Sequence, residues 1–289
     1  MKILVTGGAG FIGSALINKL SADNKNKIFC LDNFFSSSDT DFIDDVVYIP
    51  GSTNNISKLV KFKPDVVYHL GEYSRISTSF DEIQTVWKLN VEGTFRVLEF
   101  CRKNKCKLIY GGSSSKFGNS GQDENLSPYA WIKAKNVELI KNYGEWYGLE
   151  YAIAYFFNVY GEGQLSKGKY ATVIGIFIDQ INNNKPLTVI KPGTQKRYFT
   201  NIDDIVEGLV KIGEKGSGDG YCLCDKNSFY SIDEVAKMFS SNIIYLPEQK
   251  GNRIDPILPY KKCQTELGWT TKIKLKDYIN KLKKENKHA

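Results

Sequence analysis

Short apolar runs alternate with amphipathic stretches through the first half of the chain. Most of the apolar runs are continuous, as is typical of strands that are buried on both faces. The predicted strands are residues 3–6, 28–32, 46–49, 65–70, 107–110 and 151–156, and helical patterns lie near 11–21, 55–62, 82–103 and 129–147. Strand, helix and strand in series predict a parallel sheet with right-handed crossover connections.

The character of the chain changes after about residue 157, where Gly, Pro, Lys and Asn become frequent and the regular alternation ends. The amphipathic pattern at 200–214 predicts a helix that returns to pack on the sheet. We therefore predict an α/β fold, a Rossmann-type doubly wound parallel sheet with a smaller C-terminal substrate-binding lobe. The sheet domain is expected to comprise residues 1–156 with a returning segment of about 200–220, and the lobe residues 157–199 and 221–289. Ligands usually bind in the cleft between two such parts.

Composition narrows the class of protein. The chain has 289 residues, 42% hydrophobic and 25% charged, which suits a globular protein with a full core. The net charge of +7 mildly favours anionic ligands, but the lysines are dispersed, which is not typical of a nucleic-acid-binding surface. No apolar run reaches membrane-spanning length, and the first strand begins at Lys2, which leaves no room for a signal peptide. The sequence therefore predicts a cytoplasmic protein without membrane or nucleic-acid partners.

Six cysteines accompany only two histidines, His69 and His288. That combination does not favour a zinc site. In a cytoplasmic protein we expect the cysteines to be reduced thiols that fill space in the core, and we predict no metal site.

Residues 7–13, GGAGFIG, follow the first predicted strand and open the first predicted helix. Gly7, Gly10 and Gly13 suit a turn whose backbone approaches a pyrophosphate, while the helix start presents free N–H groups to the phosphates. The second predicted strand ends at Asp32, 19 residues after Gly13, where an acidic residue binds the adenosine ribose hydroxyls. Because Asp32 also repels a 2′-phosphate, the site is predicted to bind NAD rather than NADP.

Tyr129 and Lys133 are four residues apart, which places them on one face of the helix whose first turn contains Pro128. A neighbouring ammonium group stabilises a tyrosine phenolate and so makes it a usable base. The serine cluster at 113–115 directly follows a predicted strand, at the carboxyl edge of the sheet where ligands bind. The dinucleotide motif, the Tyr–Lys pair and the serines together predict redox chemistry at a bound dinucleotide.

These motifs resemble the extended short-chain dehydrogenase/reductase family, and within it the NAD-dependent nucleotide-sugar epimerases and dehydratases. The resemblance is carried by TGGAGFIG, Asp32, the HL pair at 69–70, Asn90-x-x-Gly93-Thr94, the serine run closing with Phe117-Gly118, and Tyr129-x-x-x-Lys133. In the second half, FFNVYGEG (156–163), GTQKRYFTNIDD (193–204) and ELGW (266–269) follow in the family's order. The resemblance covers nearly the whole chain.

The resemblance implies a role for each matching residue. The catalytic set would be Ser113, which hydrogen-bonds the sugar 4-hydroxyl, Tyr129, which takes its proton, and Lys133, which holds the nicotinamide ribose. The NAD-binding residues would be Gly7, Gly10, Phe11, Ile12, Gly13, Asp32, Asn33, Leu70, Asn90 and Lys133. The nucleotide-sugar substrate would be bound by Ser114, Asn158, Arg197 and Arg253. The arginines suit the nucleotide portion because each can bond two diphosphate oxygens at once.

The chain departs from the family pattern at several positions. Ser114 and Ser115 stand where the dehydratases carry an Asp-Glu pair, and loss of water across C5–C6 needs an acid and a base there. The glutamate of the decarboxylases is also missing. Glu72 stands in place of an alanine, which puts an unusual charge near the cofactor. The remaining departures are Gly71 for another alanine, Tyr155 for an arginine, Ser52 for an aspartate near the adenine, and a tight spacing in Arg253-Ile254-Asp255.

We therefore predict an NAD-dependent nucleotide-sugar epimerase, an isomerase that acts at C4 through a transient 4-keto intermediate, with the sugar and nucleotide left open. A nucleotide-sugar oxidoreductase, either a 4-keto reductase or a 4-dehydrogenase, is the first alternative. A 4,6-dehydratase is disfavoured by Ser114 and Ser115, and a non-catalytic NAD-sensing protein would not need the set of Ser113, Tyr129 and Lys133. The family resemblance implies a role in carbohydrate biosynthesis.

The helices predicted at 82–103 and 129–147 correspond to the pair that forms a four-helix dimer interface in the family. A homodimer is therefore predicted, against the alternative that these helix faces pack entirely on the protein's own sheet. The candidate apolar contacts are Phe95, Leu98, Trp131, Val137 and Tyr143.

Overall fold

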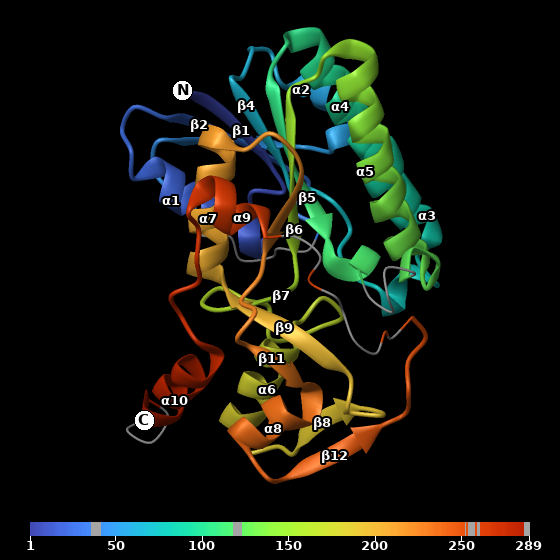
Figure 1. Ribbon diagram of the computed structural model, residues 1–289, viewed down its shortest axis with the longest axis vertical. Helices are drawn as coiled ribbons and strands as arrows, with labels where there is room; N and C mark the ends of the chain where they lie inside the picture. Colours follow the sequence, from blue (N-terminus) through green and yellow to red (C-terminus); the bar gives the residue numbers. More distant parts are fainter. Residues whose placement is uncertain (36–41, 118–122, 252, 254–257, 259–260, 286–289) are drawn as a thin grey trace.

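The computed structural model describes residues 1–35, 42–117, 123–251, 253, 258 and 261–285. Gly118, Ile254, Asp255 and His288, which entered the sequence predictions, lie outside the described residues. The described chain forms a large sheet domain and a smaller lobe at its lower end (Figure 1).

The large sheet has seven parallel strands in the order β10-β6-β5-β4-β1-β2-β3. The strands are β1 (Lys2–Thr6), β2 (Lys27–Asp32), β3 (Val46–Pro50), β4 (Val66–His69), β5 (Lys107–Ser113), β6 (Tyr151–Phe156) and β10 (Gly218–Leu223). The chain first builds outward from β1 through β2 and β3, and then crosses to the other side of β1 with β4. The carboxyl ends of β1 and β4 therefore form the switch point at which open α/β sheets bind ligands.

Helices cover both faces of this sheet (Figure 1). One face carries α1 (Phe11–Ser21), α7 (Ile202–Lys215) and α9 (Lys262–Leu267), and the other carries α2 (Ile56–Leu59), α4 (Gly93–Asn104) and α5 (Pro128–Tyr147). Ile3 and Val5 of β1 belong to the core on the α1 and α7 side, whereas Leu4 belongs to the core on the α4 and α5 side. Burial on both faces explains why the strands read as continuous apolar runs.

The smaller lobe has its own core, which includes the fully buried Tyr160, Phe177 and Phe199. Its strands are β7 (Asn158–Tyr160), β9 (Lys196–Asn201) and β11 (Phe229–Ser231) in one sheet, and β8 (Leu187–Ile190) and β12 (Ile243–Leu246) in another. Its helices are α6 (Val173–Asn182), α8 (Ile232–Phe239) and α10 (Leu275–Glu285). A capping box between Ser231 and Glu234 fixes the start of α8.

The predicted fold class is confirmed, and each of the six predicted strands lies in the large sheet. The predicted helix at 82–103 is interrupted, because α3 (Ile83–Val86) is followed by a π-helical segment, Trp87–Glu92, before α4 begins. β10 spans the boundary predicted near residue 220 and completes the edge of the large sheet, and α9 packs beside it. The division of the chain into domains stays a prediction.

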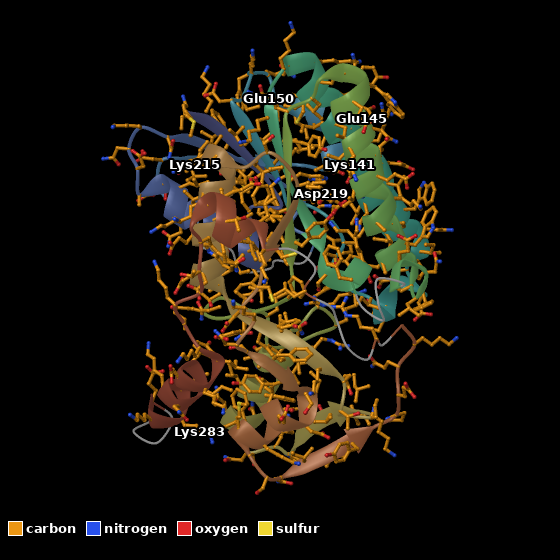
Figure 2. All side chains as sticks on the ribbon, in the orientation of Figure 1. Lys141, Glu145, Glu150, Lys215, Asp219 and Lys283 are labelled. Atoms are coloured by element: carbon orange, nitrogen blue, oxygen red, sulfur yellow. The ribbon has the colours of Figure 1, made fainter. Side chains whose placement is uncertain are left out.

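Among the described residues, every helix is too short or too polar to span a bilayer. Charged side chains of both signs are spread over the surface, with Lys141, Glu145 and Lys215 on the sheet domain and Lys283 on the lobe (Figure 2). The six cysteines are free thiols, and all are buried.

The apolar positions proposed for a dimer interface divide into two groups. Leu98, Val137 and Tyr143 are buried in the core between the sheet and α4 and α5, so their prediction as interface contacts is wrong. Phe95 and Trp131 are each 40% exposed. A helical pattern shows which positions are apolar, but it does not show which of two apolar stripes faces the sheet.

Candidate active site

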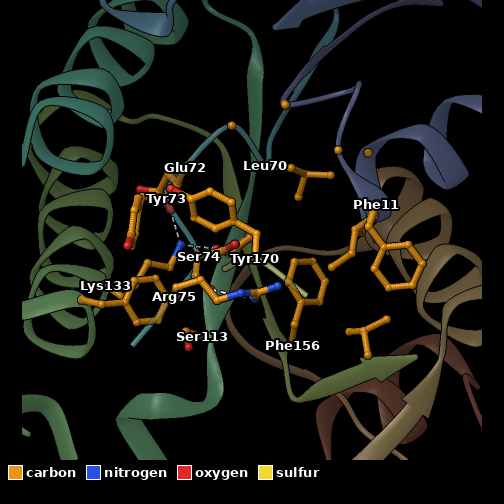
Figure 3. A pocket seen from close by; sticks show the side chains of 18 of the residues that line it. Phe11, Leu70, Glu72, Tyr73, Ser74, Arg75, Ser113, Lys133, Phe156 and Tyr170 are labelled. Carbon is orange, nitrogen blue, oxygen red and sulfur yellow. Dashed lines mark hydrogen bonds and ion pairs between the residues drawn. The ribbon is translucent and has the colours of Figure 1, made fainter. Parts of the chain in front are cut away.

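A cavity of about 450 Å³ lies at the carboxyl edge of the large sheet. Its walls come from the segments that follow β1, β2, β4 and β5, and from lobe residues that include Asn158 and Tyr170. Figure 3 shows that Phe11, Glu72, Arg75, Ser113 and Lys133 all belong to this one pocket. The volume lies within the range of small-molecule and cofactor sites.

The glycine turn between β1 and α1 forms one end of the cavity. Gly7 has a φ of +72°, and a Cβ there would lie 2.6 Å from the backbone of Gly71. A Cβ on Gly13 would lie 2.1 Å from the carbonyl oxygen of Gly7, so the start of α1 packs directly on the turn. A Cβ on Gly10 would meet only that same oxygen, at 3.4 Å. The protein's own packing therefore requires Gly7 and Gly13, whereas Gly10 leaves space on the cavity side.

Asp32 closes this end of the cavity from the end of β2. Its two carboxylate oxygens accept hydrogen bonds from the backbone N–H of Ala9 at 2.9 Å and of Phe34 at 2.8 Å. The carboxylate therefore holds the glycine turn in place and also lines the cavity, where Phe11, Ile12, Asn33 and Leu70 lie as well. The open space beside Gly10, the free N–H groups at the start of α1 and this acidic group fit a dinucleotide.

The Gly10→Ala variant is expected to fold but to weaken NAD binding by a factor on the order of ten or more, because a methyl group would occupy the space left for the pyrophosphate. Calorimetric titration with NAD measures the loss. Gly13→Ala is the comparison: its Cβ would overlap the backbone of the turn, so this variant is expected to lower the melting temperature as well. Unchanged NAD affinity in Gly10→Ala would contradict this account of the turn.

Helix α5 carries the predicted Tyr–Lys pair. The Ser127 side chain caps the helix by accepting a hydrogen bond from the Ala130 N–H at 3.0 Å, and Pro128 occupies the first turn. Tyr129, Lys133 and Asn136 follow at intervals of four and three residues, so they share one face of the helix. All three are buried, and the first two line the cavity.

The ammonium group of Lys133 forms an ion pair with Glu72 and donates a hydrogen bond to the carbonyl oxygen of Gly111. Each side chain of the pair is only 5% exposed. The ammonium also lies 4.2 Å from the centre of the Tyr110 ring. Glu72 is therefore the counter-ion of Lys133.

Glu72 is held by three further donors from three different elements. It accepts hydrogen bonds from the Tyr110 hydroxyl at 3.0 and 3.1 Å, from the Asn136 amide at 2.9 Å and from the Thr94 hydroxyl at 2.6 Å. Burial and the negative charge of Glu72 raise the pKa of Tyr110 well above its usual range, so Tyr110 stays a neutral donor. A carboxylate with this many partners is fixed in position.

His69 lies behind this network and is completely buried. Its Nε2 lies 2.9 Å from the Thr94 hydroxyl, and its Nδ1 lies 2.7 Å from the Thr6 hydroxyl. Because the Thr94 hydroxyl donates to Glu72, it accepts from Nε2, which assigns the tautomer of a neutral ring. Burial lowers the pKa of His69 to about 4.

The buried His69 is expected to make the free energy of unfolding depend on pH. The pKa of His69 is 6.5 in the unfolded chain and about 4 in the folded protein. Between these two pH values the unfolded chain binds a proton that the folded ring does not. Stability is therefore expected to fall as the pH drops through this window, by at most about 3 kcal/mol at 1.36 kcal/mol per pH unit. Urea unfolding of the wild type and of His69→Gln, measured from pH 7 to 4, tests this, because the variant should lack that part of the slope.

Asn90 was predicted to bind NAD. It lies on the π-helical segment and is not among the residues that line the cavity. Its side-chain oxygen accepts from the Tyr73 N–H at 2.6 Å, and its amide donates to the Tyr73 carbonyl oxygen at 2.9 Å. Asn90 thus clamps the backbone one residue after Glu72. In the structure Asn90 therefore contributes to the site through the Tyr73 backbone. A motif match gives the position of a residue in the chain but not the direction of its side chain.

The predicted substrate-binding residues are only partly brought together. Ser113, Ser114, Asn158 and Arg253 line the cavity, and Arg253 donates to the Ser114 hydroxyl at 2.8 Å. Arg197 is not among the lining residues, but its guanidinium donates to the carbonyl oxygen of Arg253 at 2.9 Å. Arg197 therefore supports the segment that carries Arg253.

Two of the substituted positions have structural roles. The Tyr155 hydroxyl donates to Asp219 at 2.7 Å, which links β6 to β10. Ser52 caps the helical turn at Thr53–Asn55 by accepting from the Asn54 N–H at 3.3 Å, and it lines the cavity near Asp32.

Three further residues line the cavity that the sequence did not predict, namely Tyr73, Arg75 and Tyr170. Tyr73 and Tyr170 pack edge to face at 5.9 Å between ring centres. For Tyr73 and Arg75 the available signal was their position in the chain. The segment that follows β4 lies at the same edge of the sheet as the serines that follow β5.

Comparison with known proteins agrees with this geometry. Residues 3–223 match the model of the NAD dependent epimerase/dehydratase family. A putative UDP-glucose 4-epimerase of Methanocaldococcus jannaschii is 31% identical over 297 residues, which cover 97% of this chain and 96% of that protein. UDP-glucuronic acid decarboxylase 6 of Arabidopsis thaliana is 31% identical over 301 residues, covering 96% and 86%. The UDP-glucose 4-epimerase of Thermotoga maritima, solved with UDP-glucose, superposes with a TM-score of 0.89 at 25% identity over 100% of this chain and 99% of that one.

Proposed function

The chain belongs to the NAD-dependent epimerase/dehydratase family, uses NAD as its cofactor, and on that premise we propose that it is a nucleotide-sugar 4-epimerase. The observation that carries the proposal is the meeting of Ser113, Tyr129 and Lys133 in the cavity that the glycine turn opens. The similarity to the 4-epimerases of M. jannaschii and T. maritima over nearly their full lengths supports it.

In this proposal the glycine turn and Asp32 would hold the adenosine diphosphate part of NAD, and Lys133 would bind the nicotinamide ribose. Bound NAD supplies the acceptor and donor of hydride. Tyr129 accepts the proton of the sugar 4-hydroxyl and later returns it, while Ser113 orients that hydroxyl by a hydrogen bond. Ser113 is itself oriented, because its Oγ accepts from the Ser115 N–H at 3.2 Å.

The substrate diphosphate would lie against Asn158 and Arg253. Arg253 is 5% exposed, and its contact with Ser114 holds the guanidinium at the cavity wall. An arginine in this position can bond two phosphate oxygens at once.

The serine cluster disfavours 4,6-dehydration, although the family includes dehydratases. Ser114 is occupied by Arg253, and the Ser115 hydroxyl is buried without a partner among the described residues. Neither serine supplies the acid and base that removal of water across C5–C6 needs. The second candidate is a nucleotide-sugar oxidoreductase, which would use the same Tyr129 and an exchangeable cofactor.

Proton NMR of the protein with NAD and a panel of nucleotide sugars tests the proposed reaction. We expect a second set of anomeric signals that grows to a fixed ratio without accumulation of NADH. A C6 methyl doublet would instead identify a dehydratase. Stoichiometric formation of NADH would identify the oxidoreductase.

We further propose that the protein is a homodimer that pairs through α3, α4, α5 and the π-helical segment. Trp87, Trp131 and Phe95 are 46%, 40% and 40% exposed there. Trp87 and Trp131 line a shallow apolar depression together with Phe80 and Ile83. The family's dimer interface uses the corresponding helices. Sedimentation at micromolar concentration should give the dimer mass, and a monomer would contradict the proposal.

A further inference from the structure

Arg75 is a cation in the cavity that the proposed roles leave unused. It lies six residues after His69, the last residue of β4, and its side chain lines the pocket together with Ser113 (Figure 3). Tyr129 lines the same pocket. The clamp of Asn90 on Tyr73 fixes the backbone two residues before it. The structure therefore holds this guanidinium in the same cavity as the proposed base, Tyr129.

No carboxylate of the described residues lies within 4.0 Å of the Arg75 guanidinium. One of its terminal nitrogens donates to the Ser74 carbonyl oxygen at 3.1 Å, and its Nε is buried without a hydrogen-bond partner in the part of the chain that the structure describes. Burial lowers the pKa of Arg75, and the groups that oppose this effect are the hydroxyls of Tyr129, Tyr73 and Tyr170. Arg75 is half-buried with its Nε enclosed, and it faces tyrosine hydroxyls with no carboxylate of the described residues as a counter-ion.

The neighbouring charges are already paired. Glu72 and Lys133 neutralise one another, and both oxygens of Asp32 are bonded to the glycine turn and to Phe34. No protein carboxylate of the described cavity is thus available to Arg75.

We propose that the sugar carries a carboxylate and that Arg75 binds it, so that the substrate class is a nucleotide-activated hexuronic acid. This inference rests on the proposed function. Tyr129 acts at C4 in that proposal, and a carboxylate at C6 is attached to the neighbouring ring carbon. A guanidinium that lines the same cavity as Tyr129 and feels the charge of its hydroxyl is suitably placed for it, and its planar fork matches the two carboxylate oxygens.

Binding can be compared with ligand pairs that differ only at C6: UDP-glucuronate with UDP-glucose, and GDP-mannuronate with GDP-mannose. Calorimetric titration is made on the NAD-loaded Tyr129→Phe protein, so that no ligand is converted, with and without Arg75→Met. We expect the uronate of one pair to bind about tenfold or more tighter than its neutral partner, as for a hydrogen-bonded charge pair. Arg75→Met should remove this preference and leave the affinity for the neutral sugar within about twofold.

Arg102→Met serves as the matched control, because Arg102 lies outside the cavity in a surface ion pair with Glu99. It should retain the full preference, and thermal unfolding of each variant shows whether it is folded. Equal affinity for acidic and neutral sugars, or equal loss of both in Arg75→Met, would overturn the inference and leave the 4-epimerase proposal standing. Failure of all four ligands to bind would overturn the inference, and the proton NMR panel would then decide the 4-epimerase proposal separately.

Discussion

Replacing Tyr129 with phenylalanine is expected to lower kcat by about two to four orders of magnitude, the contribution typical of a positioned acid–base group. The ring would keep its place in the small buried cluster with Tyr73, Val86 and Ile132, so the fold and the NAD affinity should stay close to wild type. Turnover is measured by the NMR exchange of anomeric signals, and NAD affinity by calorimetry.

Tyr147→Phe is the matched control for this substitution. Tyr147 is the last residue of the same helix and is 54% exposed, so loss of its hydroxyl should leave kcat unchanged. A Tyr129→Phe protein that retains its turnover would remove Tyr129 from the proposed mechanism. A wild-type protein that binds NAD but turns over no sugar would instead favour an NAD-sensing role.

The second large effect is expected at Glu72. Glu72→Gln keeps the size of the side chain but leaves the Lys133 ammonium buried without its counter-ion. Breaking a buried ion pair in this way is expected to lower the free energy of unfolding by about 3 kcal/mol or more. Urea unfolding of the NAD-free protein measures the change, and added NAD should recover part of it if Lys133 gains a contact with the ribose.

A double-mutant cycle separates the ion pair from the rest of the network. Lys133→Met combined with Glu72→Gln should be more stable than the sum of the two single losses predicts. The exposed pair Lys135 and Glu138, at 3.0 Å on the same helix, gives the control, because Glu138→Gln should cost less than about 1 kcal/mol. Strictly additive losses at 72 and 133 would show that the pair is not coupled.

The parts of the structure that the sequence predicted are those with local signals. Continuous apolar runs identified the strands, and the glycine spacing with Asp32 identified the cavity end that is built from consecutive residues. The spacing of Tyr129 and Lys133 placed both on one helix face, which the structure confirms by burying them together.

The parts that the sequence did not predict depend on contacts between distant segments. Glu72 receives its partners from β5, α4 and α5, and no spacing rule relates Glu72 to Asn136 or Thr94. Asn90 bonds the Tyr73 backbone from a π-helical segment, which the apolar pattern at 82–103 did not indicate. The alternation of apolar and polar residues records burial, but it carries no information on which polar group is the partner.

The π-helical segment at Trp87–Glu92 has the form of a one-residue insertion that a helix absorbs locally, without turning the flanking helices out of register. A homologue one residue shorter here would therefore keep α4 in place and lose the Asn90 clamp on Tyr73. A gap in an alignment at these positions would then mark a difference in the segment that carries Glu72 and Arg75. Such a gap would identify family members that bind a different ligand at this segment, although the gap falls within a helix rather than in a loop.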